Sequence, residues 1–362
     1  MADSSQSSPP KHAGSSPRSA AGSPPAQSSP PAANVVVEGQ VSTTIHPEIE
    51  ADYSESAYSD NDLGSDTTSL KSEILHYRFE NGRRYHSSSI AEDNEYFVPN
   101  DEIESDRLDL THHVMRIMQN GNLFGAPIGR NPQKILDIGT GTGIWAIEVA
   151  DMFPSATVIG NDLSPIQPAC VQFEIDDVEK EWTHTEGSFD LIYSRYMLGS
   201  IRDWPRLIRQ AYKALRPGGY LEILEPDSTL HSDDGTLRED SPLMDWNRRF
   251  IAAAEAELGS SIIEAPRYKG YIVDAGFVDI HEDIFKLPNA PWPKDKNLKM
   301  AGKYHMPALL EGLEPLSLHV LTKAGMSLAE TRVLFDRAKM DVRNKGIHTY
   351  FNLHRYVARK PE

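Results

Sequence analysis

Residues 135–145 read ILDIGTGTGIW, which combines a short apolar strand, a glycine-rich turn and the first residues of a helix. Gly139, Gly141 and Gly143 are spaced G-x-G-x-G and follow an acidic residue, Asp137. Glycine can adopt left-handed backbone conformations and lets the main chain approach a bound molecule closely. The segment therefore predicts a strand–turn–helix unit that holds a nucleotide-like ligand, and it limits the fold to those that contain such a unit.

Strand and helix patterns alternate from residue 134 onward, which indicates a mostly parallel sheet with helices on both faces. Helices are expected at GIWAIEVADMF, WPRLIRQAYKALR and YKGYIVDAG, and between about 293 and 346. Seven strands are expected, at KILDIG, ATVIGND, VQFEIDD, FDLIYSR, YLEILEP, FVDIHEDIFKLP and HTYFNLHRYVARK. The predicted fold class is therefore α/β, with a seven-stranded, Rossmann-like sheet.

The N-terminal part of the chain has a different composition. Ser, Pro and Ala fill 24 of the first 34 positions, and residues 46–66 are acidic. Such segments cannot bury enough apolar surface to offset the entropy lost on ordering, so residues 1–68 are predicted to be a disordered tail. Deleting residues 1–45 is accordingly expected to leave the melting temperature unchanged.

The rest of the chain divides into three consecutive parts. Residues 69–133 are predicted to form a helical cap, with a short helix at SLKSEILHYRFENG and a longer helix capped by Asn100. Residues 134–292 form the predicted ligand-binding core. Residues 293–362 are predicted to add a helical insertion and the closing strand of the same domain.

Charge and composition exclude several classes of protein. The formal net charge is −17 and no basic patch is evident, so direct binding to nucleic acid is not expected. Cys170 is the only cysteine, which favours a reducing, intracellular compartment, either the nucleus or the cytoplasm. No apolar run approaches the roughly 20 residues that span a bilayer. The 13 histidines form no metal-ligating pattern, so neither a membrane span nor a metal is expected.

The spacing of the glycines discriminates between three kinds of ligand. A dinucleotide fingerprint is G-x-G-x-x-G, but Ile144 stands where its third glycine would be, and no Lys-Ser or Lys-Thr pair follows to form a P-loop. Acidic-x-G-x-G-x-G is instead typical of class I methyltransferases, which bind S-adenosylmethionine (AdoMet). AdoMet has a sulfonium cation and no phosphate, so its site needs close backbone approach and an acceptor such as Asp137 near the cationic end.

Acidic residues also stand at the ends of the next two expected strands. Asp162 ends VIGND, where a carboxylate can accept both ribose hydroxyls, and Asp177 ends FEIDD, where it can accept from the adenine amino group. Val178 follows and can touch the adenine ring. Ligands of open α/β sheets bind at the carboxyl ends of the strands, so these positions suit a nucleoside.

Longer stretches resemble the LaeA-like family of fungal methyltransferases. They are ILDIGTGTGIWAIEVADMFPSATVIGNDLSPIQP, VQFEIDDVEKEW, FDLIYSRYMLGSIRDWP and LRPGGYLEILE, with ENGRRYH and FVPNDEIESDRLDLTHH upstream, over roughly residues 69–358. The resemblance implies a class I methyltransferase fold, S-adenosyl-L-methionine as cofactor and a role in fungal secondary metabolism. The cofactor-binding residues that it implies are Asp137, Gly139, Gly141, Gly143, Asp162, Leu163, Asp177, Val178 and Ser194.

The acceptor side of the site is less well defined. Tyr196, His112 and His113 are the candidates for catalysis, with Arg195 beside them. The link from Leu163 to Cys170 is shorter than the corresponding link in the family. It is also shorter than a parallel crossover, which normally takes about a dozen residues. Trp292, Tyr304 and Met306 are aromatic or flexible apolar residues that could line an acceptor pocket.

Two functions remain open at this point. The first is an AdoMet-dependent methyltransferase that acts on a small-molecule or protein acceptor. The second is a regulatory module that controls secondary-metabolite gene expression through partners such as velvet-domain proteins or a sister methyltransferase, with weak or no methyl transfer. The Ser-Pro steps of the tail favour the second function, whereas the strand-end carboxylates favour cofactor binding in both.

Overall fold

The computed structural model describes residues 33–37, 41–52, 78–80, 83–85, 99–163 and 171–362. The described residues belong to one compact unit, Ala32–Glu362. Residues 1–32, 38–40 and 53–68 of the predicted disordered tail lie outside the described residues. So do residues 69–77 and 81–82 of the short helix expected over 69–82, and residues 164–170 of the link between Leu163 and Cys170.

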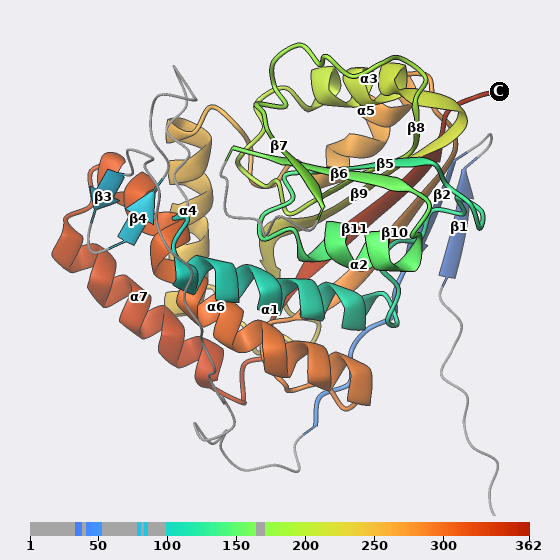
Figure 1. Ribbon diagram of the computed structural model, residues 1–362. Coiled ribbons are helices and arrows are strands. Elements are labelled where there is room, and N and C mark those ends of the chain that lie inside the picture. Colours follow the sequence, from blue (N-terminus) through green and yellow to red (C-terminus); the bar gives the residue numbers. More distant parts are fainter. Residues whose placement is uncertain (1–32, 38–40, 53–77, 81–82, 86–98, 164–170) are drawn as a thin grey trace, which may run out of the picture. The chain divides into compact units, whose positions relative to one another are not determined.

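A mixed sheet runs through this unit (Figure 1). Its central strands pair in parallel, and β11 lies antiparallel between β9 and β10. From one edge to the other, the strands are β1 (Ala33–Val37), β2 (Val41–Ile45), β10 (Val278–Pro288), β11 (Tyr350–Arg359), β9 (Leu215–His231), β8 (Phe189–Arg195), β5 (Lys134–Ile138), β6 (Thr157–Asp162) and β7 (Gln172–Ile175). The seven expected strands are all present, and numbered among themselves they run 3-2-1-4-5-7-6, which confirms the α/β fold class.

The strand order reverses between β5 and β8. The chain fills the sheet from β5 outward to β6 and β7, and then returns to the other side of β5 with β8 and β9. Ligands of open α/β sheets bind outside the carboxyl ends of the strands at such a reversal. The topology therefore places a ligand site next to the turn that follows β5.

Two N-terminal strands extend the expected seven-stranded sheet. Strand β2 pairs in parallel with β10, from Val41 opposite Ile280 to Ile45 opposite Ile284, and β1 pairs antiparallel with β2. The prediction of an unpacked tail up to residue 68 is therefore wrong for residues 41–52. The segment VSTTI is rich in β-branched residues, and this local strand preference outweighs the acidic composition of the residues that follow.

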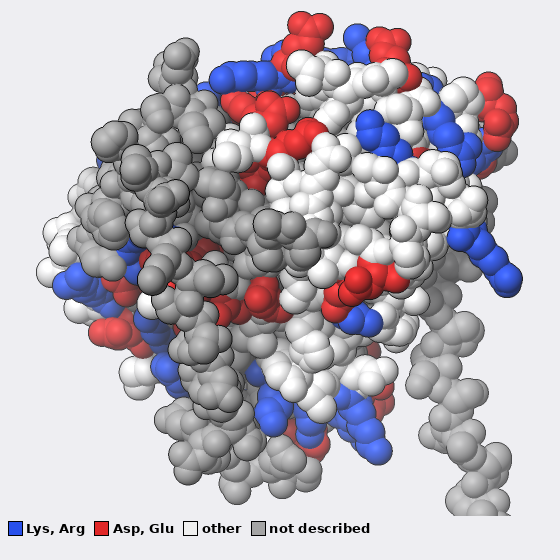
Figure 2. Space-filling model, viewed as in Figure 1, with Lys and Arg blue, Asp and Glu red and all other residues white. Residues whose placement is uncertain are grey.

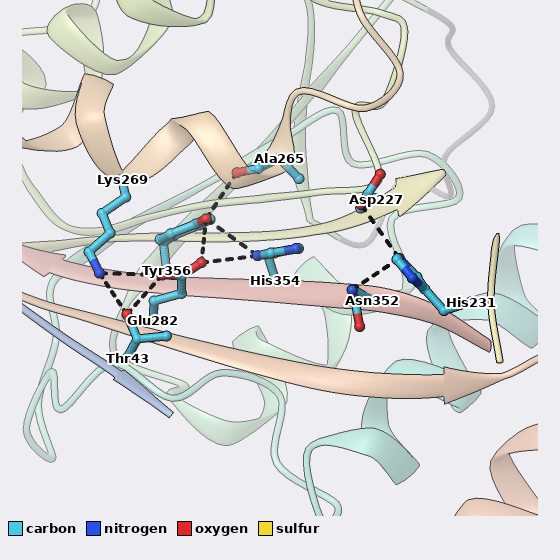
Figure 3. Close-up of polar contacts among 9 residues, drawn as sticks. All are labelled: Thr43, Asp227, His231, Ala265, Lys269, Glu282, Asn352, His354 and Tyr356. Carbon is cyan, nitrogen blue, oxygen red and sulfur yellow. Dashed lines mark hydrogen bonds and ion pairs between the residues drawn. The ribbon is translucent and has the colours of Figure 1, made fainter. Parts of the chain in front are cut away.

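A network of polar side chains ties β2 to β10 and β11 (Figure 3). Glu282 accepts hydrogen bonds from Thr43 Oγ1 at 3.0 Å and from the Tyr356 hydroxyl at 2.7 Å, and its Oε1 lies 3.0 Å from His354 Nδ1. Lys269 donates to Thr43 Oγ1 at 2.6 Å. Burial alone would raise the pKa of Glu282, but the hydrogen bonds from His354, Tyr356 and Thr43 outweigh it and lower that pKa to about 2. The ionised carboxylate thus holds three neighbouring strands together.

Helices cover both faces of the sheet (Figure 1). On one face, Trp204 of α3 (Trp204–Ala214) packs on Tyr268 of α5 (Tyr268–Asp274), with ring centroids 4.2 Å apart. On the other face, Trp145 of α2 (Ile144–Met152) stacks on Tyr193 of β8 at 4.1 Å. All four rings are buried, so each face of the sheet has its own apolar core.

The long helix α1 (Glu102–Met118) lies beside α2 and α6 (Lys296–Lys323). Its N-cap is Asp101, whose side chain accepts from the Glu104 amide, and not Asn100 as the sequence predicted. Asp101 also accepts two hydrogen bonds from Arg83. Its carboxylate suits this guanidinium better than the side-chain amide of Asn100 would, which favours Asp101 as the N-cap. Upstream, β3 (Arg78–Glu80) and β4 (Arg83–Tyr85) form a two-stranded ribbon where the sequence predicted the end of a helix.

Three helices form a second apolar cluster next to the sheet. They are α4 (Pro242–Glu257), α7 (Leu328–Arg343) and the C-terminal half of α6. A helical region from about 293 to 346 was expected and is formed by α6 and α7, but α4 was not expected. Its Ser241 cap and Pro242 are ordinary start signals, and its mixed charged and aromatic sequence gives only a weak amphipathic pattern.

Candidate functional site

The turn after β5 adopts a conformation that only glycine tolerates well. Gly139, Gly141 and Gly143 have φ angles of 64°, 58° and 81°, all in the left-handed region. A Cβ atom on Gly139 would lie 2.0 Å from the Sδ atom of Met197, so the turn also needs glycine for space. Residues 139–142 of the turn line the neighbouring cavity, with the Met197 side chain packed against Gly139.

A cavity of about 310 Å³ lies beside this turn, at the carboxyl ends of β5, β6, β7 and β8. This is the place that the reversal of strand order indicates. Helix α1 contributes Leu108, Thr111 and His112 to one side, and α6 contributes His319 and Lys323. The cavity therefore lies between the parallel sheet and the helices that cover its end.

The cavity brings together six of the nine predicted cofactor-binding residues: Gly139, Gly141, Asp162, Leu163, Asp177 and Val178. Asp137, Gly143 and Ser194 are not among the described residues of its wall. Asp137 is fully buried under the turn, where its Oδ2 accepts from Thr140 Oγ1 at 2.6 Å, and burial raises its pKa to about 6. The Thr140 contact means that this acid supports the turn, while its Oδ1 has no hydrogen-bond partner among the described residues.

The two acids predicted at the strand ends, Asp162 and Asp177, both line the cavity. Asp162 Oδ2 accepts from the Gly141 amide at 2.8 Å, which ties the end of β6 to the glycine turn. Asp177 Oδ1 accepts from the Glu179 amide at 3.0 Å, which fixes the loop after β7. Both carboxylates are thus held in place by the backbone before any ligand binds.

His112 is engaged at both ring nitrogens. Arg195 Nη1 lies 2.6 Å from His112 Nδ1, and because a guanidinium only donates, Nδ1 must accept. The other nitrogen, Nε2, then carries the proton and donates to Glu148 Oε2 at 3.1 Å. Burial, followed by the charges of Arg195 and Arg116, lowers the pKa of His112 to about 3. His112 therefore acts as a neutral clamp between β8, α1 and α2, with no nitrogen left for a substrate.

The other two candidates for catalysis lie in different surroundings. His113 is exposed and touches the ring of Tyr304 edge-on, with centroids 4.6 Å apart, away from the cavity. Tyr196 lines the cavity and has a φ of 53°, which is uncommon for a residue with a side chain. Its amide donates to the Leu224 carbonyl at 3.2 Å, which holds the unusual conformation. Of the three candidates, His112 and Tyr196 therefore line the cavity and His113 does not.

Glu225, at the end of the parallel part of β9, supports the residues that follow Tyr196. Its Oε1 accepts from the Met197 amide at 2.7 Å, and the side chain is fully buried. Burial raises the pKa of Glu225 to about 8, although its backbone hydrogen bonds act in the opposite direction. Glu225 is therefore mostly protonated at neutral pH and supports the loop as a neutral group.

Sequence reasoning missed several residues of the site because they come from distant elements. Asp109 of α1 accepts from Thr142 Oγ1 at 2.6 Å and so attaches α1 to the glycine turn.

Trp292, Tyr304 and Met306, which were considered for the acceptor pocket, lie outside the cavity walls that the described residues form. Trp292 instead packs in a small cluster with Tyr350.

The described residues show no group of three or more acidic, His or Cys side chains arranged to hold a metal ion. In the same part of the chain, no helix is both long and apolar enough to cross a bilayer. On the face drawn in Figure 2, the coloured Lys and Arg side chains are scattered among Asp and Glu and do not merge into one basic patch.

A 3-2-1-4-5-7-6 sheet with a glycine-turn cavity at its strand reversal and carboxylates at successive strand ends defines a class I methyltransferase. A profile for a methyltransferase domain matches residues 110–282. Methyltransferase pytC of Aspergillus terreus is 42% identical over 306 residues, which cover 83% of this chain and 93% of that one. Secondary metabolism regulator LAE1 of Cochliobolus heterostrophus is 37% identical over 294 residues, 78% and 94% of the two chains.

The chain therefore belongs to the LaeA-like family of fungal AdoMet-dependent methyltransferases. Among solved structures, phosphoethanolamine N-methyltransferase 2 of Haemonchus contortus is similar with a TM-score of 0.42 and 21% identity. That match covers 69% of this chain and 52% of the other.

Proposed function

We propose that the chain holds AdoMet in the 310 Å³ cavity and methylates a small-molecule acceptor. The observation that carries this proposal is the glycine turn, which presents bare main chain to a cavity that Asp162 also lines. The cavity volume lies at the lower end of the range of roughly 300–1,000 Å³ that is usual for small-molecule sites. The geometry suits a nucleoside with an uncharged or cationic tail.

Eight of the nine predicted cofactor-binding residues receive a role within this proposal. The glycine turn faces the amino acid portion of the cofactor, with Ser194 close by and Asp137 holding the turn from below. Asp162 accepts from the ribose hydroxyls. Asp177 and Val178 contact the adenine from the loop after β7.

When bound, AdoMet supplies an electrophilic methyl group on a sulfonium. The chain's own task is to align the acceptor with that group and to exclude water. The Arg195–His112–Glu148 chain fixes the wall on one side, and the backbone of Tyr196 and Met197 fixes the wall next to it. These contacts supply the rigid alignment that a direct displacement requires.

Thermal unfolding with a panel of nucleotides tests this proposal. S-adenosylhomocysteine (AdoHcy) should raise the melting temperature, because a ligand that binds only the folded state stabilises it in proportion to ln(1 + [L]/Kd). NAD and ATP at the same concentration should leave it unchanged, since the site offers no phosphate-binding loop. A larger shift with NAD than with AdoHcy would contradict the proposal.

Substitution of Asp162 tests the ribose assignment. Asp162→Ala should weaken AdoHcy binding more than tenfold, because two charge-assisted hydrogen bonds are lost. Asp151→Ala is the matched control, since Asp151 is an exposed acid at the end of α2. Equal affinity in the two variants would show that Asp162 does not hold the ribose.

A regulatory role is the second candidate, and similarity to LAE1, a secondary metabolism regulator, favours it. In this alternative, the chain works in the nucleus through a velvet-domain protein or a sister methyltransferase. A strain that lacks the gene would distinguish the two functions. Full restoration of metabolite production by Asp162→Ala, without AdoHcy binding, would favour regulation, and failure of that variant to restore production would favour methyl transfer.

A further inference from the structure

A second cavity, the acceptor chamber, lies next to the cofactor cavity. Its volume is about 130 Å³. The two cavities share the residues Leu108, Thr111, Tyr196 and Ser200, so the same wall borders both. A molecule in the chamber would therefore meet the cofactor cavity at Tyr196, next to the end of β8.

The wall of the acceptor chamber is mostly apolar and carries several rings. Trp246 and Phe250 of α4 stack at 5.5 Å between centroids, and Phe351 of β11 lies on another side. All three are buried. An engineered apolar cavity of about 150 Å³ binds benzene, so a chamber of this size and lining suits one six-membered ring.

The charged groups of the chamber neutralise each other. Arg107 donates to both carboxylate oxygens of Glu104, from Nε at 3.0 Å and from Nη2 at 2.6 Å. The two side chains lie one turn apart on α1 and are only 8% and 2% exposed. Because this pair has no net charge, the chamber favours a neutral ligand over an ion.

His305 supplies a hydrogen-bond acceptor in this apolar wall. Its Nδ1 lies 2.9 Å from the Pro288 carbonyl, and since a carbonyl only accepts, Nδ1 must carry the proton. Burial lowers the pKa of His305 to about 4, so the ring is neutral near pH 7 and Nε2 keeps its lone pair. Among the described residues, no hydrogen-bond partner for Nε2 is found.

Close packing of α6 fixes the position of His305. A Cβ atom on Gly302 would lie 2.2 Å from the Ala290 carbonyl oxygen, so only glycine allows α6 to approach the chain after β10 this closely. The ring of Phe351 meets the imidazole edge-on at 6.2 Å. Packing on two sides therefore fixes the ring of His305, and with it the position of Nε2.

We propose that the acceptor chamber binds a neutral six-membered ring bearing a hydroxyl group, and that His305 Nε2 accepts the hydrogen bond of that hydroxyl. The inference rests on the proposed function, because the ring must lie beside a bound cofactor. It makes His305 a specificity-determining residue that selects a hydroxyl over a methyl group. The substrate class is a small hydroxylated aromatic or enolic compound.

Two probes of equal shape test the proposal in the full chain saturated with AdoHcy. The probes are 4-methylphenol and 4-methyltoluene, which differ only in a hydroxyl replaced by a methyl group. The phenol should bind about fivefold more tightly to the wild type, the effect of one typical hydrogen bond. His305→Asn keeps an amide N–H for the Pro288 carbonyl but lacks Nε2, so it should reduce the difference to less than twofold.

Control variants separate the chamber from the cofactor site. His113→Asn changes an exposed histidine on α1 and should keep the fivefold preference. Ala308→Leu adds volume to the chamber wall and should abolish binding of both probes without changing AdoHcy affinity. AdoHcy affinity measured for every variant confirms that each one folds.

The outcomes are distinguishable. AdoHcy binding without binding of either probe would overturn the acceptor chamber and leave the proposed function standing. Equal affinity for the two probes, or a preference that His305→Asn preserves, would overturn the role of His305. Failure of the folded wild type to bind AdoHcy would overturn both proposals.

Discussion

Arg195 Nη1 lies 2.6 Å from His112 Nδ1, and this contact joins the end of β8 to α1. From the same imidazole, Nε2 continues to Glu148 on α2, so one buried side chain links three elements around the cavity. A histidine near a cofactor site suggests acid–base catalysis, but here the geometry uses it as a fixed connector.

Removing His112 should weaken cofactor binding. His112→Ala leaves the Arg195 guanidinium beside the cavity without this acceptor, and an unsatisfied charged donor should lower AdoHcy affinity roughly tenfold. His112→Asn retains an oxygen near the position of Nδ1 and should stay within about threefold of the wild type. His113→Ala is the neighbouring control, and calorimetry of the three variants checks the prediction. An unaffected His112→Ala variant would show that the clamp is dispensable.

Alanine substitutions at Gly139 and Gly129 distinguish the cost of backbone strain from the loss of the ligand site. Both have a left-handed φ, 64° and 77°, but a Cβ on Gly129 meets nothing within 4 Å. Gly129→Ala should cost about 1 kcal/mol of stability and leave AdoHcy affinity unchanged. Gly139→Ala should also push Met197 into the cavity and lower the affinity more than tenfold. Equal affinities in the two variants would place the ligand away from the turn.

The carboxyl of Glu225 makes stability depend on pH. Its pKa rises from an ordinary 4.5 to about 8 on folding, so the folded state binds a proton that the unfolded state has already released. The free energy of unfolding should therefore fall as the pH rises from 4.5 to about 8. Burial also raises the pKa of Glu222 to about 7 and that of Asp137 to about 6, so these two carboxyls contribute to the same fall. Glu225→Gln cannot ionise and should make the fall measurably smaller, whereas the exposed Glu181→Gln should leave it unchanged. Urea unfolding at pH 5, 7 and 9 measures both slopes, and parallel slopes for Glu225→Gln and the wild type would contradict the assignment.

Removing the N-terminal strands should lower the melting temperature. Deleting residues 1–52 removes the pairing of β2 with β10 and the Thr43 hydrogen bond to Glu282, so a drop of several degrees is expected. Deleting residues 1–32 is the control, because their composition predicts an unpacked tail. This result would reverse the expectation for a deletion of residues 1–45. Equal melting temperatures for the two deletions would show that β2 adds nothing to stability.

The cavity at the strand ends was predictable from the sequence because its signals are local. Three glycines and an acid mark one turn, Asp162 ends β6, and Asp177 follows β7 by two residues. The acceptor chamber was not predictable, because Trp246, His305 and Phe351 come from three elements far apart in the sequence. Nothing in the sequence around His305 shows that its ring meets the Pro288 carbonyl, since that contact depends on how closely α6 approaches β10.

The prediction of an unpacked tail was wrong for residues 41–52 because it rested on composition. Composition describes the average of a segment, and residues 41–45 are a short strand within a polar region. Their strand preference becomes effective only because β10 offers an unpaired edge. Such pairing depends on tertiary structure and overrides a prediction that rests on composition.

Calorimetric titration of the full chain with AdoHcy tests the central claim most directly. We predict one saturable site per chain with a micromolar Kd, and a loss of more than tenfold in affinity in Asp162→Ala. The prediction would be contradicted by a chain that unfolds cooperatively but releases no heat on titration with AdoHcy and keeps the same melting temperature when AdoHcy is added.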